Sequence, residues 1–236
     1  MKYEKSDKFD KTFMLENMMG PNCAKLLEGL SAHMALKPGM RVLDLGCGKG
    51  ITSILLAREF NTAVFATDLW IPATENYERF KAFGLEERVV PIHAEAHDLP
   101  YADEYFDAAV CVDAYLYFGQ EEGYMDDHLA PLVKPGGEIG LVIPGVKTDL
   151  DGVPEDIAPY VSVEDFGTFK STGWWKQHLE ASKRLRLERI WEFPDFDEVW
   201  ADWLASDNPY AVRDRDMIRT NAGRYMNLIC VIGRRV

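Results

Sequence analysis

Short apolar runs alternate with helix-like patterns through most of the first 145 residues of the chain. Five runs have the length of strands and lie at residues 40–45, 62–69, 88–94, 106–114 and 137–143. Several are apolar on both faces, which is typical of parallel strands that helices cover on both sides. Three stretches have the spacing of helices and lie at residues 51–60, 73–83 and 121–133. The sequence KPGG at 134–137 predicts a turn before the fifth strand. Repeated strand–helix–strand units predict an α/β fold with right-handed crossovers and a doubly wound sheet.

Both ends of the chain depart from this alternation. Residues 6–34 predict two helices that are broken at Gly20-Pro21, with Asn22 as the N-cap of the second. Beyond residue 144, a connection rich in Gly, Pro and Asp leads to three further predicted elements, namely helices at 173–182 and 195–206 and a strand with a solvated face at 182–189. We expect the aromatic side chains of the last helix to cover the open end of the sheet.

The most informative stretch is VLDLGCGKG at residues 42–50, where an apolar strand ends in alternating glycines. Glycines allow positive φ and a close approach of the backbone to a ligand, and the N-terminus of the following helix offers free N–H groups. A phosphate-binding P-loop is excluded, because Leu43 and Gly50 stand where that motif needs Gly and Ser or Thr. A dinucleotide-binding motif is disfavoured, because Ile51 occupies the position of its third glycine.

The remaining spacing is Asp44-x-Gly46-x-Gly48-x-Gly50, which resembles the first motif of class I S-adenosylmethionine-dependent methyltransferases. The resemblance implies that S-adenosylmethionine is the cofactor. It places Asp44 near the ammonium group of the cofactor and the backbone N–H groups of the loop near its carboxylate. We therefore expect Asp44, Gly46, Cys47, Gly48 and Gly50 to bind the cofactor.

The end of the second strand matches the same family. Asp68 lies 18 residues after Gly50. The resemblance implies that its carboxylate accepts hydrogen bonds from both ribose hydroxyls, with Leu69 beside it. As a bare residue, Asp68 has a simpler alternative, which is to cap the next helix.

Three later stretches resemble further motifs of the same family, in the same order along the chain. AEAHDLPY at 94–101 resembles the adenine-binding segment, so Glu95 is expected at the adenine amino group and the N–H of Ala96 at a ring nitrogen. The family more often has aspartate at the position of Glu95. Residues 103–118 resemble the fourth motif, with Asp113 at the cofactor, and residues 132–142 resemble the approach to the fifth strand.

The resemblance implies a Rossmann-like, doubly wound and mostly parallel sheet of seven strands, with helices on both faces and a helical cover from both chain ends. We expect residues 1–236 to form a single methyltransferase domain. Within it, residues 1–35 would be the N-terminal helical cover, 36–143 the cofactor-binding half, and 144–236 the substrate-side half. The chain is most similar to small-molecule methyltransferases of the ubiquinone/menaquinone-biosynthesis and sarcosine type.

Methyl transfer is an in-line displacement at a carbon that the cofactor already activates. The enzyme contributes alignment and exclusion of water, so neither a metal nor a protein nucleophile is expected. We expect the acceptor pocket beyond Asp113, between residues 114–118, the N-terminal helices and the tryptophan-rich segments. The acceptor, which the sequence does not identify, would be a small molecule.

The catalytic residue is not assigned, and Tyr115 and His178 are its candidates. Tyr115 and Tyr117 alternate on the predicted strand end, where either a contact with the acceptor or ordinary packing is expected. His178 is suited by type to accept a proton, but a histidine that shares a helix face with Trp174 is also typical of a surface or core edge. His97, in the adenine segment, is a further possible contact.

For two groups of apolar side chains, the sequence also leaves open whether they act at the site or only pack in the core. The methionines Met14, Met18 and Met19 are either an adaptable lid or ordinary helix packing. Trp200 and Trp203 are either core residues or part of an aromatic cage.

Composition narrows the range of partners. A net charge of −13 argues against nucleic acid or an anionic membrane as the main partner, and residues 182–189 are the only basic candidate. No stretch has the ~18–20 apolar residues of a membrane-spanning helix. A charged N-terminal segment predicts no secretory signal and a cytoplasmic location. The four cysteines are scattered without metal-ligand spacing and are expected to be free thiols.

Three alternatives to methyl transfer stay open. A non-catalytic S-adenosylmethionine-binding protein would carry the same motifs. A cyclopropane-forming enzyme would use the same fold on lipid acyl chains, although no basic amphipathic helix is evident. A nicotinamide-dependent oxidoreductase is disfavoured by the misplaced third glycine. The sequence does not indicate an oligomeric state.

Overall fold

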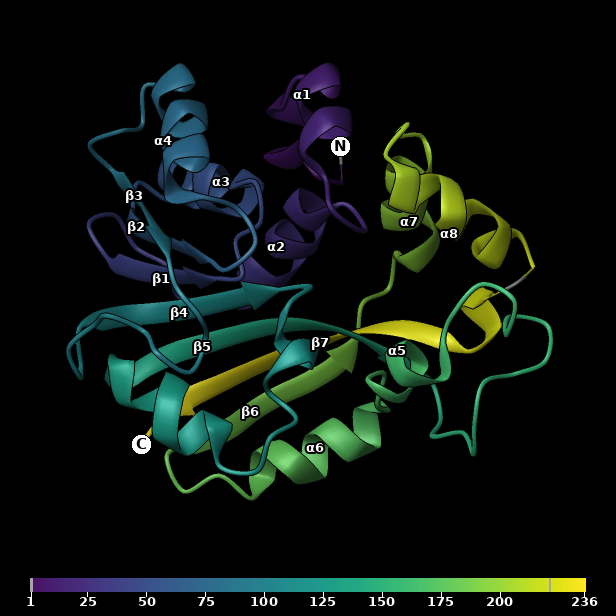
Figure 1. Cartoon of the computed structure of the whole chain (residues 1–236). Helices are drawn as coiled ribbons and strands as arrows, with labels where there is room; N and C mark the ends of the chain where they lie inside the picture. Colours follow the sequence, from purple (N-terminus) through teal and green to yellow (C-terminus); the bar gives the residue numbers. More distant parts are fainter. Residues whose placement is uncertain (1, 221) are drawn as a thin grey trace.

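A seven-stranded sheet crosses the protein in the order β3-β2-β1-β4-β5-β7-β6 (Figure 1). The computed structural model describes residues 2–220 and 222–236; Met1 and Asn221, which fall in the ranges expected for the N-terminal cover and the substrate-side half, lie outside it. The strands are β1 Arg41–Leu45, β2 Ala63–Asp68, β3 Val89–His93, β4 Phe106–Val112, β5 Val133–Val146, β6 Leu185–Glu192 and β7 Met226–Arg235. Within the described residues, β7 runs antiparallel to both of its neighbours, β5 and β6, and all the other strand pairs are parallel. The predicted mostly parallel sheet is confirmed.

Helices cover both faces of this sheet. They are α1 Lys11–Asn17, α2 Cys23–Ser31, α3 Ile51–Glu59, α4 Ala73–Ala82, α5 Val163–Gly167, α6 Thr172–Glu180, α7 Phe196–Leu204 and α8 Pro209–Arg219. Figure 1 shows α2, α3 and α4 on one side of the sheet and α6 on the other. The break at Gly20-Pro21 and the cap at Asn22 are as predicted, since the Asn22 side chain accepts a hydrogen bond from the N–H of Lys25.

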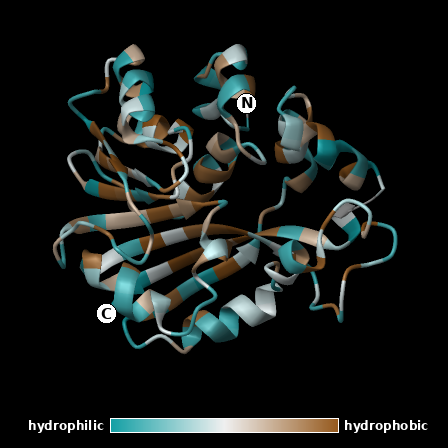
Figure 2. Cartoon of the chain, viewed as in Figure 1, coloured by the Kyte–Doolittle hydropathy of each residue, from teal (hydrophilic) through white to brown (hydrophobic). Residues whose placement is uncertain are grey.

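The central strands divide their side chains between two apolar cores. On β4, Ala108 and Val110 belong to the core under α2 and α3, whereas Ala109 and Cys111 belong to the core that α6 covers. Successive side chains of a strand point to opposite faces. The central strands are therefore apolar on both faces over much of their length, and Figure 2 shows many brown segments along them.

The order of the strands reverses between β1 and β4. The sheet grows from β1 through β2 to β3 on one side and from β4 to β5 on the other. In open α/β sheets, the loops at the carboxyl ends diverge at such a reversal and leave a crevice for a ligand. The sheet thus positions a site where β1 and β4 end.

Two predicted elements differ in the structure. The expected helix over 121–133 is wrong, because a π-helix at Met125–Leu129 and a 3₁₀ helix at Ala130–Leu132 take its place. Pro131 has no N–H to donate, so regular α-helical bonding cannot continue through it. The KPGG turn lies inside β5 rather than before it: Phe106 pairs with Val133 while Ala108 pairs with Glu138, so that residues 134–137 bulge out of the ladder.

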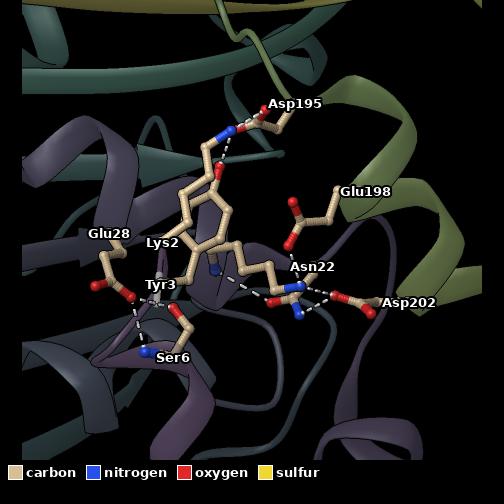
Figure 3. Close-up of polar contacts among 9 residues, drawn as sticks. Lys2, Tyr3, Ser6, Asn22, Glu28, Asp195, Glu198 and Asp202 are labelled. Carbon is tan, nitrogen blue, oxygen red and sulfur yellow. Dashed lines mark hydrogen bonds and ion pairs between the residues drawn. The ribbon is translucent and has the colours of Figure 1, made fainter.

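Residues 2–6 fasten the N-terminal segment to α2 and to the residue that precedes α7. Figure 3 shows Lys2 and Tyr3 directed toward Asp195, and both side chains donate to its carboxylate. The N–H and the hydroxyl of Ser6 donate to one oxygen of Glu28 on α2, each at 2.7 Å. Glu28 is 9% exposed, so its charge is stabilised mainly by these donors.

A second set of contacts joins α2 to α7. The Lys25 ammonium lies 2.7 Å from a carboxylate oxygen of Glu198 and 2.8 Å from one of Asp202. The Asn22 side chain also donates to Asp202, at 2.8 Å (Figure 3). The connection between α1 and α2 is therefore held in place at the edge of the crevice.

We expect Glu28→Gln to lower the free energy of unfolding at pH 7 by about 1–3 kcal/mol, because the neutral amide is a weaker acceptor for buried donors. Desolvation opposes the charged form of Glu28, but hydrogen bonds from Lys5 and Ser6 outweigh it and lower its pKa. The stabilisation is then present above the ordinary glutamate pKa and is lost as the pH falls through the lower folded value.

Urea denaturation from pH 7 to pH 3 tests this prediction. The difference between the wild type and Glu28→Gln should shrink as the solution becomes acidic. Glu86→Gln makes the same change of charge at an exposed position and should alter the stability little at any pH. A loss for Glu28→Gln that does not depend on pH would contradict the explanation.

Candidate functional site

A cavity of about 280 Å³ lies at the carboxyl ends of β1, β2 and β4. Most of the predicted cofactor residues line it: Gly46, Cys47, Gly48, Asp68, Leu69, Glu95, Ala96 and Asp113. Asp44 and Gly50 are not among the lining residues of the described chain. Met19, Gly20 and Pro21 of the α1–α2 connection also line the cavity.

The glycine loop adopts a backbone that other residues rarely take. Gly46, Gly48 and Gly50 have φ values of +72°, +53° and +80°. A Cβ on Gly46 would lie 2.4 Å from the Cβ of Ala114, and one on Gly50 would lie 2.4 Å from a ring carbon of Phe80. Both conformation and space therefore require glycine at these two positions.

Asp44 joins the end of β1 to the start of α3. One carboxylate oxygen accepts hydrogen bonds from the hydroxyls of Thr52 and Ser53, each at 2.6 Å. The other oxygen is buried and has no hydrogen-bond partner within the described residues. Desolvation raises the pKa of Asp44 to about 6, against the two hydroxyl hydrogen bonds, and the charge of Asp68 raises it further. A buried acceptor without a donor is unfavourable, so a cationic donor would stabilise this carboxylate.

Asp68 binds the backbone on both sides of the cavity. One oxygen accepts from the N–H of Gly48 at 2.8 Å, and the other accepts from the N–H groups of Trp70 and Ile71 at 2.8 and 2.9 Å. These bonds close the turn before α4 rather than cap the helix, which begins at Ala73. A carboxylate has about four acceptor sites, so capacity remains for a hydroxyl group in the cavity.

Glu95 is engaged with His97. Its carboxylate accepts from the backbone N–H of His97 at 2.9 Å and lies 2.8 Å from Nδ1 of the same residue. The other ring nitrogen, Nε2, lies 2.8 Å from a carboxylate oxygen of Glu121. The hydrogen bond with Glu95 is the largest cause of a raised His97 pKa, and it lowers the pKa of Glu95 in turn. His97, which lines the cavity, thus links Glu95 to Glu121, and the sequence did not indicate this link.

The structure brings neither candidate catalytic residue to the cavity. Tyr115 was expected on a strand end, and this was wrong, because β4 ends at Val112 and Tyr115 begins a 3₁₀ helix. It is fully buried, and its hydroxyl has no hydrogen-bond partner among the described residues. His178 stacks on Trp174, and its Nε2 lies 2.9 Å from the carbonyl oxygen of Gly119. Neither Tyr115 nor His178 is a lining residue.

Other aromatic side chains do reach the cavity. Tyr117 and Trp70 both line it and are 60% and 62% exposed, and their ring centroids lie 5.2 Å apart. Sequence reasoning missed Trp70; the available signal was its position two residues after Asp68, in the loop at the end of β2. Trp200 and Trp203 are buried in the core, and Met19 lines the cavity.

The described residues contain neither a metal-binding cluster nor a helix that could span a membrane. In residues 2–220 and 222–236, no three His, Cys, Asp or Glu side chains gather in a way that could hold a metal ion. None of the helices described above is both long and apolar enough to cross a membrane.

Comparison with known proteins agrees with this geometry. Residues 42–137 match the family described as "Methyltransferase domain". Methyltransferase GfsG from Streptomyces halstedii is 31% identical over 157 residues, which are 66% of this chain and 54% of that protein. The chain spans about half the length of several curated relatives that it matches.

Solved structures share the fold at low sequence identity. Geranyl diphosphate C-methyltransferase from Streptomyces coelicolor A3(2), in complex with Mg²⁺, geranyl-S-thiolodiphosphate and S-adenosyl-L-homocysteine, has a TM-score of 0.72 and 17% identity, covering 89% of this chain and 75% of that one. The [4+2]-cyclase SpnF has a TM-score of 0.72 and 16% identity, covering 99% and 96%. The predicted class I methyltransferase fold is confirmed, whereas the ubiquinone/menaquinone type is not.

We expect Gly50→Ala to lower the free energy of unfolding by about 2–4 kcal/mol, because it adds a left-handed alanine and a clash with Phe80. Gly84→Ala is the matched control: φ is +65° there, but no atom lies within 4 Å of the added Cβ. It should cost only about 1 kcal/mol. Urea denaturation measures both variants, and equal losses would show that the contact with Phe80 does not matter.

The pKa of His97 should lie above its ordinary value of about 6.5. NMR titration of the imidazole should show this in the wild type and a lower pKa in both Glu95→Gln and Glu121→Gln. Because the folded pKa is raised, the ion pairs stabilise the fold fully below the ordinary histidine pKa and are lost as the pH rises through the folded value. An unchanged pKa in both variants would contradict the linkage.

Proposed function

We propose that this chain, whose residues 42–137 belong to the methyltransferase domain family, transfers the methyl group of S-adenosylmethionine to a small-molecule acceptor. The observation that carries the proposal is the single cavity at the strand reversal. Eight of the ten residues expected at the cofactor line that cavity, although they come from four separate loops.

The chemistry of the lining, and of Asp44 behind it, fits this cofactor. Asp68 retains acceptor capacity for a ribose hydroxyl, and the Glu95–Ala96 loop would receive the adenine. The unpartnered oxygen of Asp44, just behind the glycine loop, would favour the cofactor's ammonium group. Loop N–H groups would meet its carboxylate at the N-terminus of α3.

The cofactor supplies a methyl group on a positively charged sulfur. The contribution of the chain is to align the acceptor and to exclude water. The α1–α2 connection lies over the glycine loop, since the sulfur of Met19 approaches the site of a Cβ on Gly48 to 3.0 Å. This connection would close the cavity over the reacting groups.

Isothermal calorimetry tests the cofactor. We expect micromolar binding of S-adenosylmethionine and S-adenosylhomocysteine, no binding of NAD, and about 10- to 100-fold weaker binding in Asp68→Asn, which loses a charged acceptor. Asp103→Asn is the control, because it removes the same charge at an exposed position. Binding of NAD in place of the other two, or binding of none, would refute the proposal.

Release of S-adenosylhomocysteine in the presence of acceptors separates catalysis from mere binding. A non-catalytic binding protein, or a catalyst that does not use the cofactor's methyl group, would bind the cofactor without releasing this product. The same assay with lipid vesicles tests the cyclopropane-forming alternative.

A further inference from the structure

Asp113 has an unusual backbone at the end of β4. Its φ is +64°, a conformation that residues other than glycine rarely adopt. Its N–H donates to the carbonyl of Val142 on β5 at 2.8 Å, so the neighbouring strand holds it in place. A Cβ on Gly20 would lie 2.2 Å from Oδ2 of Asp113. The α1–α2 connection thus leaves room for this carboxyl group only because residue 20 is glycine.

The Asp113 carboxyl lines the cavity without a donor of its own. Within the described residues, no hydrogen bond or ion pair reaches it; only burial and the charge of Asp214 act on its ionisation. Asp68 differs, because three backbone N–H groups donate to it. Within the described residues, both carboxylate oxygens of Asp113 are therefore open to a ligand, whereas Asp68 has capacity for about one more donor.

The groups around Asp113 are acidic and aromatic. Desolvation is the largest cause of a Tyr117 pKa raised to about 12, and the charges of Asp113, Asp165 and Asp214 add to it, with Arg213 opposing. Cys23 of α2 also lies within the field of Asp113. Carboxylates and aromatic rings both attract an ammonium group, whereas an anionic acceptor would be repelled and an alcohol would gain little.

We propose that Asp113 is a catalytic residue that selects an amine acceptor, which enters as an ammonium paired with this carboxylate and transfers a proton to it. The inference rests on the proposed methyl transfer. It adds the class of the acceptor and the group that takes its proton.

The reaction breaks one N–H and one C–S bond and forms one O–H and one N–C bond. One N–H bond of the ammonium breaks, its proton forms an O–H bond on Asp113, and the electron pair stays on nitrogen. The nitrogen lone pair then forms the new N–C bond while the C–S bond breaks, and that electron pair stays on sulfur. Asp113 returns its proton to solvent after the product leaves. Burial, with Asp214 second, raises the pKa of Asp113 to about 7, which suits a group that takes and returns a proton near neutrality.

Calorimetry with matched probes tests the selection, with the cofactor site saturated by S-adenosylhomocysteine. The probes are 2-phenylethylamine, 2-phenylethanol and 3-phenylpropanoate, which differ in the head group on one scaffold, together with the larger pair tryptamine and tryptophol. We expect each amine to bind at least about 10-fold more tightly than its alcohol, and the acid not to bind. The preference should disappear in Asp113→Asn, and asparagine tolerates the left-handed backbone.

Two controls separate this role from a structural one. Asp216→Asn removes the same charge from an exposed site on α8 and should keep the preference. Amine affinity should fall as the pH drops through 7 in the wild type, because Asp113 becomes neutral, but not in Asp113→Asn. His97 also lines the cavity and gains charge over this range, so the pH profile should persist in His97→Gln.

Equal binding of amine and alcohol, no binding by any amine, or a preference retained in Asp113→Asn would overturn the inference. Binding of S-adenosylhomocysteine distinguishes failure of this inference from failure of the proposed function. If it binds and the amine preference is absent, only the assignment to Asp113 fails; if it does not bind, the proposed function fails as well.

Discussion

The left-handed turn after β1 is the constraint on which the site depends. With φ positive at Gly46, Gly48 and Gly50, the chain leaves the strand and enters α3 with no side chain of its own where Ala114 and Phe80 approach Gly46 and Gly50. This tight reversal brings the hydroxyl groups at the start of α3 back to Asp44. It also presents the N–H of Gly48 to Asp68 on the next strand. One backbone conformation thus orients two carboxylates and shapes the wall of the cavity.

The second organising feature is a pair of buried carboxyl groups, Asp44 and Asp113, that no cationic side chain of the described residues pairs with. Burial raises the pKa values of Asp44 and Asp113 to about 6 and 7, and each carboxyl has capacity that no donor among the described residues fills. Buried acceptors without donors are unfavourable, and a cationic ligand relieves the cost. A sulfonium cofactor with an ammonium group and a cationic acceptor would each meet this demand. The proposed cofactor and the proposed acceptor class therefore follow from the same electrostatics.

Segments remote from the glycine loop complete the site. Hydrogen bonds and ion pairs fasten residues 2–6 and α2 to Asp195 and α7 (Figure 3). They hold the α1–α2 connection so that Gly20 meets Asp113 and Met19 meets Gly48. The cover of the cavity is thus supported by charged contacts at its outer side. Its stability and its closure over ligands are physically connected.

The sequence by itself indicated the first five strands and the glycine turn, because each depends on local rules, whereas the order of the residues predicted at the cofactor came from the resemblance to class I methyltransferases. Apolar runs of strand length, glycines where φ must be positive, and an acid at a strand end are all readable along the chain. Asp68 and Gly46 were singled out in this way, and both line the cavity. Only the tertiary structure decided which side chains share the cavity. Tyr115, two residues after the left-handed backbone of Asp113, lies in the core, while Trp70 and His97 line the cavity. The close approach of Gly20 to Asp113 joins residues that lie 93 positions apart in the sequence. No local pattern encodes such a contact, since it arises from packing between elements that fold around one sheet.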